Sequence, residues 1–448
     1  MTATAQVPAR TGGPAPSDTA RYVLVGVVAL NVLAVWVLFF TSSEGKNSTL
    51  SVAKFFAMHA ALIMMLQIVL VSRLPWLDRR IGMDRLTSWH RWVGFTLIWT
   101  VLIHVTFILL GYARLDDTDV FSTFGALAGV WASLFGMIAA AALITVALTS
   151  IRAIRRRVSY ETWHALHMLV YVAIGFGIIH QYNEPTTFRT SALAEAYWWA
   201  LWGVVIVAFL TGRLLIPLWR NAYHQYRVAE VVPESDNVTS VHVTGRNLDR
   251  LPARAGQFMI WRFPRYAGWW PANPFSLSAA PDGRSLRLTA KAVGKTSAGL
   301  RSVPVGTRVF VEGPYGAFTS LHRTKDAALL IAGGVGVTPI RALLEESTGP
   351  VVVLYRVRSE ADAVLLHELR ELAAERGAEV HLVTGRTSAA SAAGAPLGPE
   401  NLTRLVPDVA DRDVFVCGPP AMTSAVLRSL RELKVPRRQV HAERFSLA

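Results

Sequence analysis

The stretch that decides the fold is Trp89–Tyr112, with the sequence WHRWVGFTLIWTVLIHVTFILLGY. It is long enough to cross a bilayer as a helix, because a spanning helix needs about 20 mainly apolar residues. It also carries two histidines, His90 and His104. Ionisable side chains are costly inside a membrane and usually have a function there. The stretch therefore predicts a membrane protein with a functional site among its helices.

Five further apolar runs of similar length accompany it, at Tyr22–Phe40, Ala53–Ser72, Ala126–Ser150, Tyr160–Gln181 and Tyr197–Trp219. The chain has 448 residues, of which 52% are hydrophobic and only 17% charged, a composition too apolar for a soluble enzyme or a disordered scaffold. We expect a disordered tail over residues 1–21 and a bundle of six membrane-spanning helices over residues 22–220.

The loops between these runs predict an orientation. Arginines gather in Arg73–Arg91, in Arg152–Arg157 and after the last run, whereas the alternate loops hold few cations, such as Lys46, Arg114 and Arg189. Cytoplasmic loops carry the excess of Lys and Arg, so both termini are expected in the cytoplasm of a multi-pass protein of the cell membrane. The net charge of +14 then belongs to these loops and to the cytoplasmic half, and no nucleic-acid partner is expected.

Four histidines in two of the runs are candidate metal ligands. His90 and His104 are about 21 Å apart along a helix and within about 40° of one face. His167 and His180 have nearly the same rise, although an ideal helix would place them about 140° apart. Neutral imidazoles at matching depth on two helices suit two bis-His b-type haems.

Other readings of the histidines remain open. His164 lies one turn before His167 and is its rival as ligand, and local unwinding at Gly175 and Gly177 would ease the angle between His167 and His180. His59 is expected to be a polar packing or haem-propionate residue. A histidine-lined transporter with a regulatory nucleotide domain is the alternative of another class.

One cysteine, Cys417, limits the redox chemistry. It excludes a disulfide framework, a thiolate zinc site and a cysteine-ligated iron–sulfur cluster.

The second half of the chain changes pattern at about residue 221. Short alternating segments such as Ser240–Thr244, Gln257–Phe263, Arg284–Val293 and Arg308–Glu312 predict an antiparallel β-barrel over residues 221–322. Strands and helices then alternate over residues 323–448, which predicts an α/β doubly wound domain with a parallel sheet.

Two turns in this last domain are candidate nucleotide-binding segments, because each follows a buried strand. Glycines there let backbone N–H groups and a helix N-terminus approach a pyrophosphate, and small residues leave room for a nicotinamide. The candidate residues are Gly333, Gly334, Gly336, Thr338, Pro339, Cys417, Gly418 and Pro419. Arg356, Arg358 and Arg386 follow the next strands, and guanidinium groups suit a 2′-phosphate, so NADPH is expected rather than NADH.

Several motifs occur in a fixed order: Asn273–Ser278 (NPFSLS), Val293–Ser297 (VGKTS), Glu312–Gly316 (EGPYG), the two glycine turns and Glu443–Phe445. This order resembles the ferredoxin–NADP reductase module. Together with six spans and the histidine pairs, the chain from about residue 22 resembles the NADPH oxidase/ferric reductase superfamily.

The resemblance implies roles for individual residues. Asn273, Pro274, Phe275, Ser276, Leu277 and Ser278 would form the flavin segment, in which Ser276 bonds to the isoalloxazine ring. Gly294, Thr296 and Ser297 would hold the FAD pyrophosphate, and Phe445 would stack on the flavin. Ser276, Cys417 and Phe445 are the candidate catalytic residues. Members of the superfamily usually have His at the position of Asn273, which leaves the contact there open.

The implied function is an NAD(P)H oxidoreductase that passes electrons from NADPH through FAD and two haems to an acceptor outside the cell. Oxygen-reducing members of the superfamily resemble one another in a further His at the position where this chain has Ile108. The terminal electron acceptor therefore stays open, and the candidates are a ferric chelate, another metal complex or oxygen, which would give superoxide. A flavin reductase with a membrane anchor, serving a soluble or quinone acceptor, is the alternative. Besides NADPH and the acceptor, membrane lipid is the expected partner.

Overall fold

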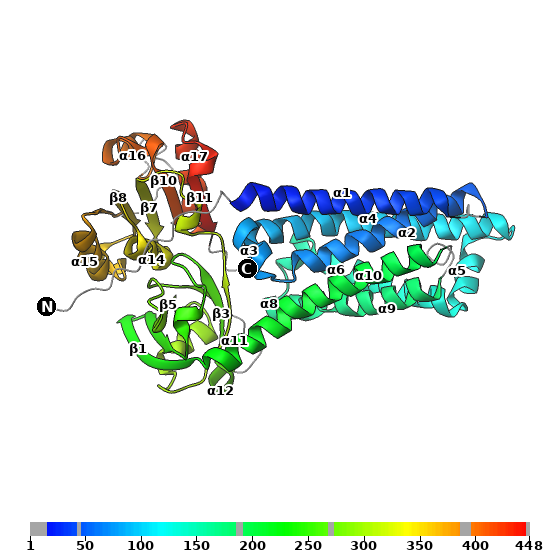
Figure 1. The fold of residues 1–448 in the computed structure, drawn as a ribbon, viewed down its shortest axis with the longest axis horizontal. Coiled ribbons are helices and arrows are strands. Elements are labelled where there is room, and N and C mark those ends of the chain that lie inside the picture. The colour runs from blue at the N-terminus through cyan, green and yellow to red at the C-terminus, as the bar shows by residue number, and fades with distance from the viewer. Residues whose placement is uncertain (1–15, 43–45, 185–190, 268–272, 386–395, 445–448) are drawn as a thin grey trace. The chain divides into compact units, whose positions relative to one another are not determined.

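The computed structural model describes residues 16–42, 46–184, 191–267, 273–385 and 396–444 (Figure 1). Residues 1–15 of the predicted tail, Arg386 and Phe445 lie outside this part. The chain divides into two compact units. The helical unit contains Thr19–Leu74 and Asp84–Leu214, and the αβ unit contains Pro75–Met83 and Leu215–Leu447.

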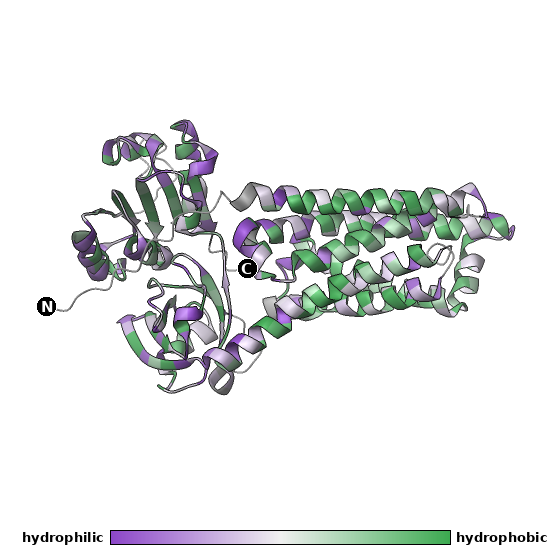
Figure 2. Ribbon diagram, viewed as in Figure 1, coloured by the Kyte–Doolittle hydropathy of each residue, from purple (hydrophilic) through white to green (hydrophobic). Residues whose placement is uncertain are grey.

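The helical unit has six helices that are long and apolar enough to cross a membrane, at Thr19–Thr41, Ser48–Leu70, Arg85–Leu115, Trp131–Ser150, Thr162–Asn183 and Ala192–His224. Figure 2 shows the mainly hydrophobic colour along these helices. The elements are α1 (Pro16–Thr41), α2 (Ser48–Leu70), α4 (Met83–Leu115), α5 (Val120–Ala128), α6 (Trp131–Ser150), α7 (Arg152–Arg155), α8 (Tyr160–His167), α9 (Leu169–Asn183) and α10 (Ala192–Leu210). The predicted architecture of six apolar helices is confirmed.

Two of the predicted runs are interrupted. The run from Ala126 begins in α5, which ends at Ala128, and the fourth long helix starts only at Trp131. The run from Tyr160 has one irregular turn at Met168, between α8 and α9, where the backbone stays helical (φ −66°, ψ −15°) and the N–H donates to both His164 O and Ala165 O. The unwinding considered at Gly175 and Gly177 is not found, because α9 continues through both glycines.

A glutamine side chain links two helices of the helical unit. The side chains of Trp198 and Trp202 in α10 are buried, and their Nε1–H groups both donate to Oε1 of Gln181 at 3.2 Å. These two hydrogen bonds to the half-buried Gln181 connect α9 to α10.

The first part of the αβ unit is antiparallel. Its strands are β1 (Arg227–Ser235), β2 (Val238–Thr244), β3 (Phe258–Arg262), β4 (Asn273–Ser276), β5 (Ser285–Lys291) and β6 (Phe310–Tyr315). They form two three-stranded sheets, ordered β1-β2-β5 and β4-β3-β6. Bridges between Leu277 and Leu288 and between Arg227 and Arg308 connect the sheets. The predicted antiparallel domain is present, as an open barrel rather than a closed one.

The second part is a five-stranded parallel sheet ordered β11-β10-β7-β8-β9. The strands are β7 (Ala328–Gly333), β8 (Val351–Arg356), β9 (Glu379–Val383), β10 (Asp413–Gly418) and β11 (Val440–Arg444). The helices are α14 (Val337–Glu346), α15 (Leu366–Arg376), α16 (Pro399–Leu405) and α17 (Pro420–Glu432). Alternate residues face opposite sides: Leu330 packs in the core under α14 and α15, and Leu329 in the core under α16 and α17.

Two helices join the antiparallel part from beside the spans. One is α3 (Pro75–Ile81), which lies between two spans in the sequence but belongs to the αβ unit. Its buried Asp78 accepts a hydrogen bond from the backbone N–H of Gly316 at 2.9 Å. The other is α11 (Ile216–His224), which follows the sixth span through a short π-helical segment, Thr211–Leu215.

Candidate functional site

The predicted histidine pairs lie together in the helical unit. The ring centres of His90 and His167 are 6.3 Å apart, and those of His104 and His180 are 6.5 Å apart. His90 and His104 both belong to α4, whereas His167 ends α8 and His180 lies in α9. The turn at Met168 separates the last two, so the ideal-helix angle between them does not apply.

These spacings agree with two imidazoles on opposite sides of one metal ion. An imidazole nitrogen binds a transition metal at about 2 Å, and the ring centre lies roughly 1.1 Å behind that nitrogen, so two opposed rings have centres about 6 Å apart. The observed 6.3 and 6.5 Å are close to this value. The residues present thus fit a metal ion with two axial histidines, as in a b-type haem.

The ring orientation of the second pair is fixed by the backbone. Nδ1 of His104 lies 3.0 Å from the carbonyl oxygen of Ala53, and Nδ1 of His180 lies 2.8 Å from that of Ala132. Because a carbonyl only accepts, each Nδ1 carries the hydrogen and each Nε2 keeps its lone pair. Histidines that bind metals commonly donate their other N–H in this way.

A glycine makes room for one of these rings. A Cβ at Gly136 in α6 would lie 2.9 Å from Nδ1 of His180 and 3.0 Å from its Cε1. Only a residue without a side chain lets α6 approach the ring this closely. Gly136 was not among the predicted site residues. The available sequence signal was a glycine inside an apolar span, because small residues in membrane helices allow close contact between neighbouring helices.

The other membrane histidines differ in their contacts. His59 accepts a hydrogen bond from Trp36 Nε1 at 3.0 Å, and its Nδ1 lies 2.8 Å from the carbonyl oxygen of Phe55. Both of its ring nitrogens are therefore in use, which agrees with a packing role. His164 has its ring 6.5 Å from the ring of Trp163, and the ring that lies opposite His90 is that of His167.

The predicted flavin segment lies along β4, which pairs with β3. Trp261 Nε1 donates to the carbonyl oxygen of Phe275 at 3.2 Å, and Phe275 packs partly against the core of the antiparallel part. Pro274 is exposed and Asn273 half-buried. Ser276 is buried, and its Oγ has no hydrogen-bond partner among the described residues. A polar ligand edge would supply one, so Ser276 fits a contact with the isoalloxazine ring.

The neighbouring candidates have contacts within the protein. Leu277 is fully buried, and Oγ of Ser278 bonds to Arg287 Nε at 3.0 Å and to Thr289 Oγ1 at 2.8 Å. Oγ of Ser297 accepts from the N–H groups of Val293 and Gly294 at 3.0 and 3.1 Å. Gly294 is exposed and Thr296 half-buried at the start of the short helix α13 (Lys295–Gly299). Their contacts with FAD stay predictions.

The two glycine turns pack against each other at the ends of β7 and β10. A Cβ at Gly336 would lie 2.4 Å from the carbonyl oxygen of Cys417, and one at Gly418 would lie 3.0 Å from Cα of Gly333. Gly334 differs, because it has a φ of +54° and nothing within 4 Å of its Cβ position. Gly333, Gly336 and Gly418 therefore allow the two turns to pack closely, whereas the Cβ position of Gly334 faces open space.

This pair of turns occupies the switch point of the sheet. β7 has β8 on one side and β10 on the other, the arrangement at which doubly wound sheets bind their ligands. Cys417 is fully buried, Pro419 is exposed, and the buried Thr338 donates from Oγ1 to Val335 O at 3.1 Å, with Pro339 buried beside it. The geometry fits a dinucleotide laid across the half-buried Gly334 and the exposed Pro419.

Three family models match successive parts of the chain. They are a ferric reductase like transmembrane component over residues 56–178, an FAD-binding domain over residues 223–319 and an oxidoreductase NAD-binding domain over residues 330–428. The chain has the domain order of the ferric reductase/NADPH oxidase-type fusion. It is a membrane-associated FAD- and NAD-binding oxidoreductase.

Curated relatives of this fusion oxidoreductase match about half of it. The ferredoxin reductase component of 3-ketosteroid-9-alpha-monooxygenase from Mycobacterium tuberculosis is 32% identical over 240 residues, which cover 49% of this chain and 65% of the relative. A flavohemoprotein from Vibrio cholerae is 30% identical over 244 residues, covering 51% and 60%. The solved FAD/NAD-binding domain of a Vibrio cholerae nitric oxide dioxygenase has 26% identity and a TM-score of 0.40, covering 50% of this chain and 98% of that one.

The two nucleotide-binding parts of the oxidoreductase are joined by an ion-pair network. Arg287 of β5 makes two 3.0 Å hydrogen bonds to the carboxylate of Glu368 in α15, which also accepts from Arg341 of α14 at 2.9 Å. Burial alone would raise the pKa of Glu368, but the hydrogen bonds and charge of Arg287, together with Arg341, lower it below its ordinary value. This network was not predicted, because its members are far apart in the chain.

The predicted NADPH arginines of the oxidoreductase are in different situations. The NH1 group of Arg356 donates to the carbonyl oxygens of Val357 at 2.7 Å and Val383 at 3.1 Å, so it binds backbone at the ends of β8 and β9. Arg358 is exposed. Of the two, Arg358 has the guanidinium better placed to meet a phosphate.

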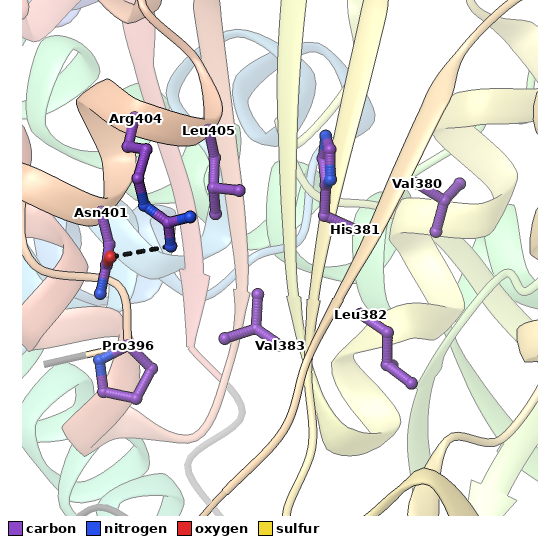
Figure 3. Close-up of a pocket in the computed structure, with 8 residues that line it drawn as sticks. All are labelled: Val380, His381, Leu382, Val383, Pro396, Asn401, Arg404 and Leu405. Atoms are coloured by element: carbon purple, nitrogen blue, oxygen red, sulfur yellow. Dashed lines mark hydrogen bonds between the residues drawn. The ribbon is translucent and has the colours of Figure 1, made fainter.

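A cavity of about 510 Å³ lies away from the switch point, at the edge strand β9 (Figure 3). Its lining consists of Val380, His381, Leu382, Val383, Pro396, Asn401, Arg404 and Leu405. Arg404 donates to Oδ1 of Asn401 at 3.1 Å across its rim.

Proposed function

We propose that this oxidoreductase carries electrons from NADPH across the membrane, with FAD and two b-type haems as its bound groups. When bound, FAD converts a hydride into single electrons, and the haems carry such electrons through the thickness of the membrane. The observation that carries the proposal is the pairing of His90 with His167 and of His104 with His180 at ring distances of 6.3 and 6.5 Å.

The helical unit sets the position of the four histidine rings and the tautomer of His104 and His180. On α4, His90 and His104 are about 21 Å apart along the axis, so the two pairs lie at different depths in the bilayer. The carbonyls of Ala53 and Ala132 hold the rings of the second pair with Nε2 turned away from them. The surrounding apolar side chains exclude water, which sets the potential of a bound metal.

The αβ unit binds and orients the nucleotides. Ser276 offers the hydroxyl that lacks a partner, Gly334 leaves the backbone accessible, and Arg358 meets the 2′-phosphate that distinguishes NADPH. Phe445, Cys417 and Arg386 keep the roles that are expected from the sequence. Both termini are placed in the cytoplasm, where NADPH is available.

His90 with His167, and His104 with His180, would each hold one haem, and haems held by two imidazoles would supply one-electron transfer to an acceptor that does not bind the iron. We expect the acceptor to be a ferric chelate, another metal complex or oxygen, on the outer side of the cell membrane. Ile108 stands where oxygen-reducing members of the superfamily have a further histidine, which favours a metal complex.

The experiment is an absorption spectrum of the purified protein before and after anaerobic addition of NADPH. We expect a b-type Soret band that shifts on reduction, and oxygen, ferric chelate and quinone are then added in turn to find which reoxidises it. His104→Ala and His180→Ala should each lose about one of two haems and stop reduction of the acceptor, with NADPH still bleaching the flavin.

His59→Ala is the matched control, because His59 also lies in a span but has both ring nitrogens bonded to protein. It should keep the haem content of the unmodified protein. Absence of a b-type band, or acceptor reduction that survives His104→Ala, would refute transmembrane transfer and favour a flavin reductase with a membrane anchor.

A further inference from the structure

The helix that leaves the sixth span has its polarity reversed. Leu215, Leu218 and Trp219, at i, i+3 and i+4, are 59%, 56% and 61% exposed. On another face of the same helix Asn221 and His224 are 4% and 2% exposed. A surface helix in water turns its polar residues outward and its apolar residues inward.

The buried polar residues are bound to the antiparallel part of the αβ unit. Asn221 donates from Nδ2 to Val311 O at 2.7 Å and accepts from Val311 N–H at 2.8 Å. Nδ1 of His224 lies 2.9 Å from the carbonyl oxygen of Arg246. These bonds fix the rotation of α11, so Leu215, Leu218 and Trp219 cannot turn inward to escape water.

The sequence places this face next to the membrane. The helical stretch Ala192–His224 has 33 residues, which is about 50 Å at 1.5 Å per residue. The hydrocarbon core is only about 30 Å thick, so the last dozen or so residues extend into or past the headgroup region. The exposed apolar residues of α11 thus follow directly along the chain on a stretch that is itself long enough to cross the hydrocarbon core.

A basic, aromatic cavity adjoins this face. It has a volume of about 450 Å³ and is lined by Trp219, Arg220, Tyr223, His224, Arg250 and Pro252. The rings of Trp219 and Tyr223 stack at 5.3 Å, and Arg250 donates to the hydroxyl of Tyr223 at 2.9 Å. No carboxylate is among the lining residues.

Arg79 of α3 is a further cation near Arg220, outside the lining of the cavity. Burial and then the charges of Arg220 and Arg254 lower the pKa of Arg79 in α3, against the opposing effect of Asp78. Three guanidinium groups near one another favour a bound anion, and guanidinium forks match phosphate oxygens.

We propose that α11 lies in the headgroup region of the bilayer and that the cavity beside it binds the phosphate of an anionic phospholipid. Leu215, Leu218 and Trp219 contact acyl chains, and Trp219 and Tyr223 lie at the level where amphipathic rings collect. Arg250 and Arg220 supply the charge. This inference rests on the membrane helices and not on the haem proposal.

The first test uses cysteine labelling of the full chain in lipid nanodiscs. The native Cys417 is fully buried, so the background is low. Leu218→Cys and Leu215→Cys should react about tenfold more slowly with a charged, water-soluble maleimide than Ala374→Cys, an exposed helical position in α15. Equal rates at all three positions would overturn the membrane contact of α11.

The second test counts lipids by native mass spectrometry after release from discs of phosphatidylcholine with one third phosphatidylglycerol. The unmodified protein should keep one phosphatidylglycerol that Arg250→Ala loses. Arg404→Ala is the matched control, since Arg404 also lines a cavity and bonds a side-chain oxygen, but in the NAD-binding part. The headgroup site is refuted if both variants keep the lipid or both lose it. Flavin content confirms that each variant is folded.

Discussion

Replacing Gly136 by alanine tests the haem proposal through a single methyl group. The new Cβ would lie 2.9 Å from Nδ1 of His180, where ordinary contact begins at 3.4 Å. The ring or α6 must therefore shift by about 0.5 Å, which is about the tolerance of a metal-binding geometry. The same shift strains the hydrogen bond from His180 to Ala132 O.

The size of the effect follows from the packing. Forcing one extra methyl into a filled site costs about 1–3 kcal/mol. At 1.4 kcal/mol per factor of ten, the haem at His104 and His180 should be held roughly 5–150 times more weakly. Gly175→Ala is the control, because a Cβ there meets nothing within 4 Å and both substitutions gain the same helix propensity of about 1 kcal/mol.

The assay is haem per protein, measured as the pyridine haemochrome during dilution into haem-free detergent. Gly136→Ala should lose about one of two haems faster than either the unmodified protein or Gly175→Ala, with its flavin retained. If Gly136→Ala and Gly175→Ala keep haem equally well, His180 does not bind it in the orientation described.

Three further outcomes are expected. Glu368→Gln should lower the unfolding free energy by about 2 kcal/mol, because it removes the ion pairs of Glu368 with Arg287 and Arg341. These pairs are only partly buried, so the loss is smaller than for a fully buried ion pair. The pKa of Glu368 is lower in the folded protein than its ordinary value of about 4.3, so its stabilising contribution to the unfolding free energy is complete above about pH 4.3. That contribution is lost as the pH falls through the pKa of the folded protein. Chemical denaturation at a series of pH values should show this loss, and Glu368→Gln should abolish it. Gly336→Ala should lower the Tm of the flavin-bound protein more than Gly334→Ala does. The Gly334→Ala substitution costs about 1–2 kcal/mol, because only the left-handed φ of Gly334 opposes it. Equal shifts of Tm in the two variants would contradict the packing of the two turns. Arg358→Ala should raise KM for NADPH about tenfold and leave KM for NADH within about twofold, whereas Arg356→Ala should chiefly lower Tm; steady-state kinetics with both nucleotides decides this.

Length and periodicity were sufficient to predict the large elements. An apolar run of about 20 residues has few alternatives to a spanning helix, and a rise of 1.5 Å per residue sets His90 and His104 at two depths whatever surrounds them. The parallel sheet follows from buried runs that alternate with helices. These features depend on local rules, so the sequence contains them directly.

The contacts that depend on distant parts of the chain were not predictable. No Pro or Gly marks the turn at Met168, which forms because two carbonyls of α8 share one N–H. The use of Arg356 on the carbonyl of Val383 depends on how β8 pairs with β9. The place of α3 in the αβ unit rests on Asp78 reaching Gly316, 238 residues away.

The difference between one continuous helix and one interrupted helix has a consequence for how such sequences tolerate insertions and deletions. Adding one residue to α4 between His90 and His104 would rotate the second ring by about 100° and move it off its partner. In the fifth span the irregular turn at Met168 lies between His167 and His180, and a change of winding there can offset part of such a rotation. The spacing between histidines should therefore be fixed in the third span of related chains and free to vary by a residue in the fifth.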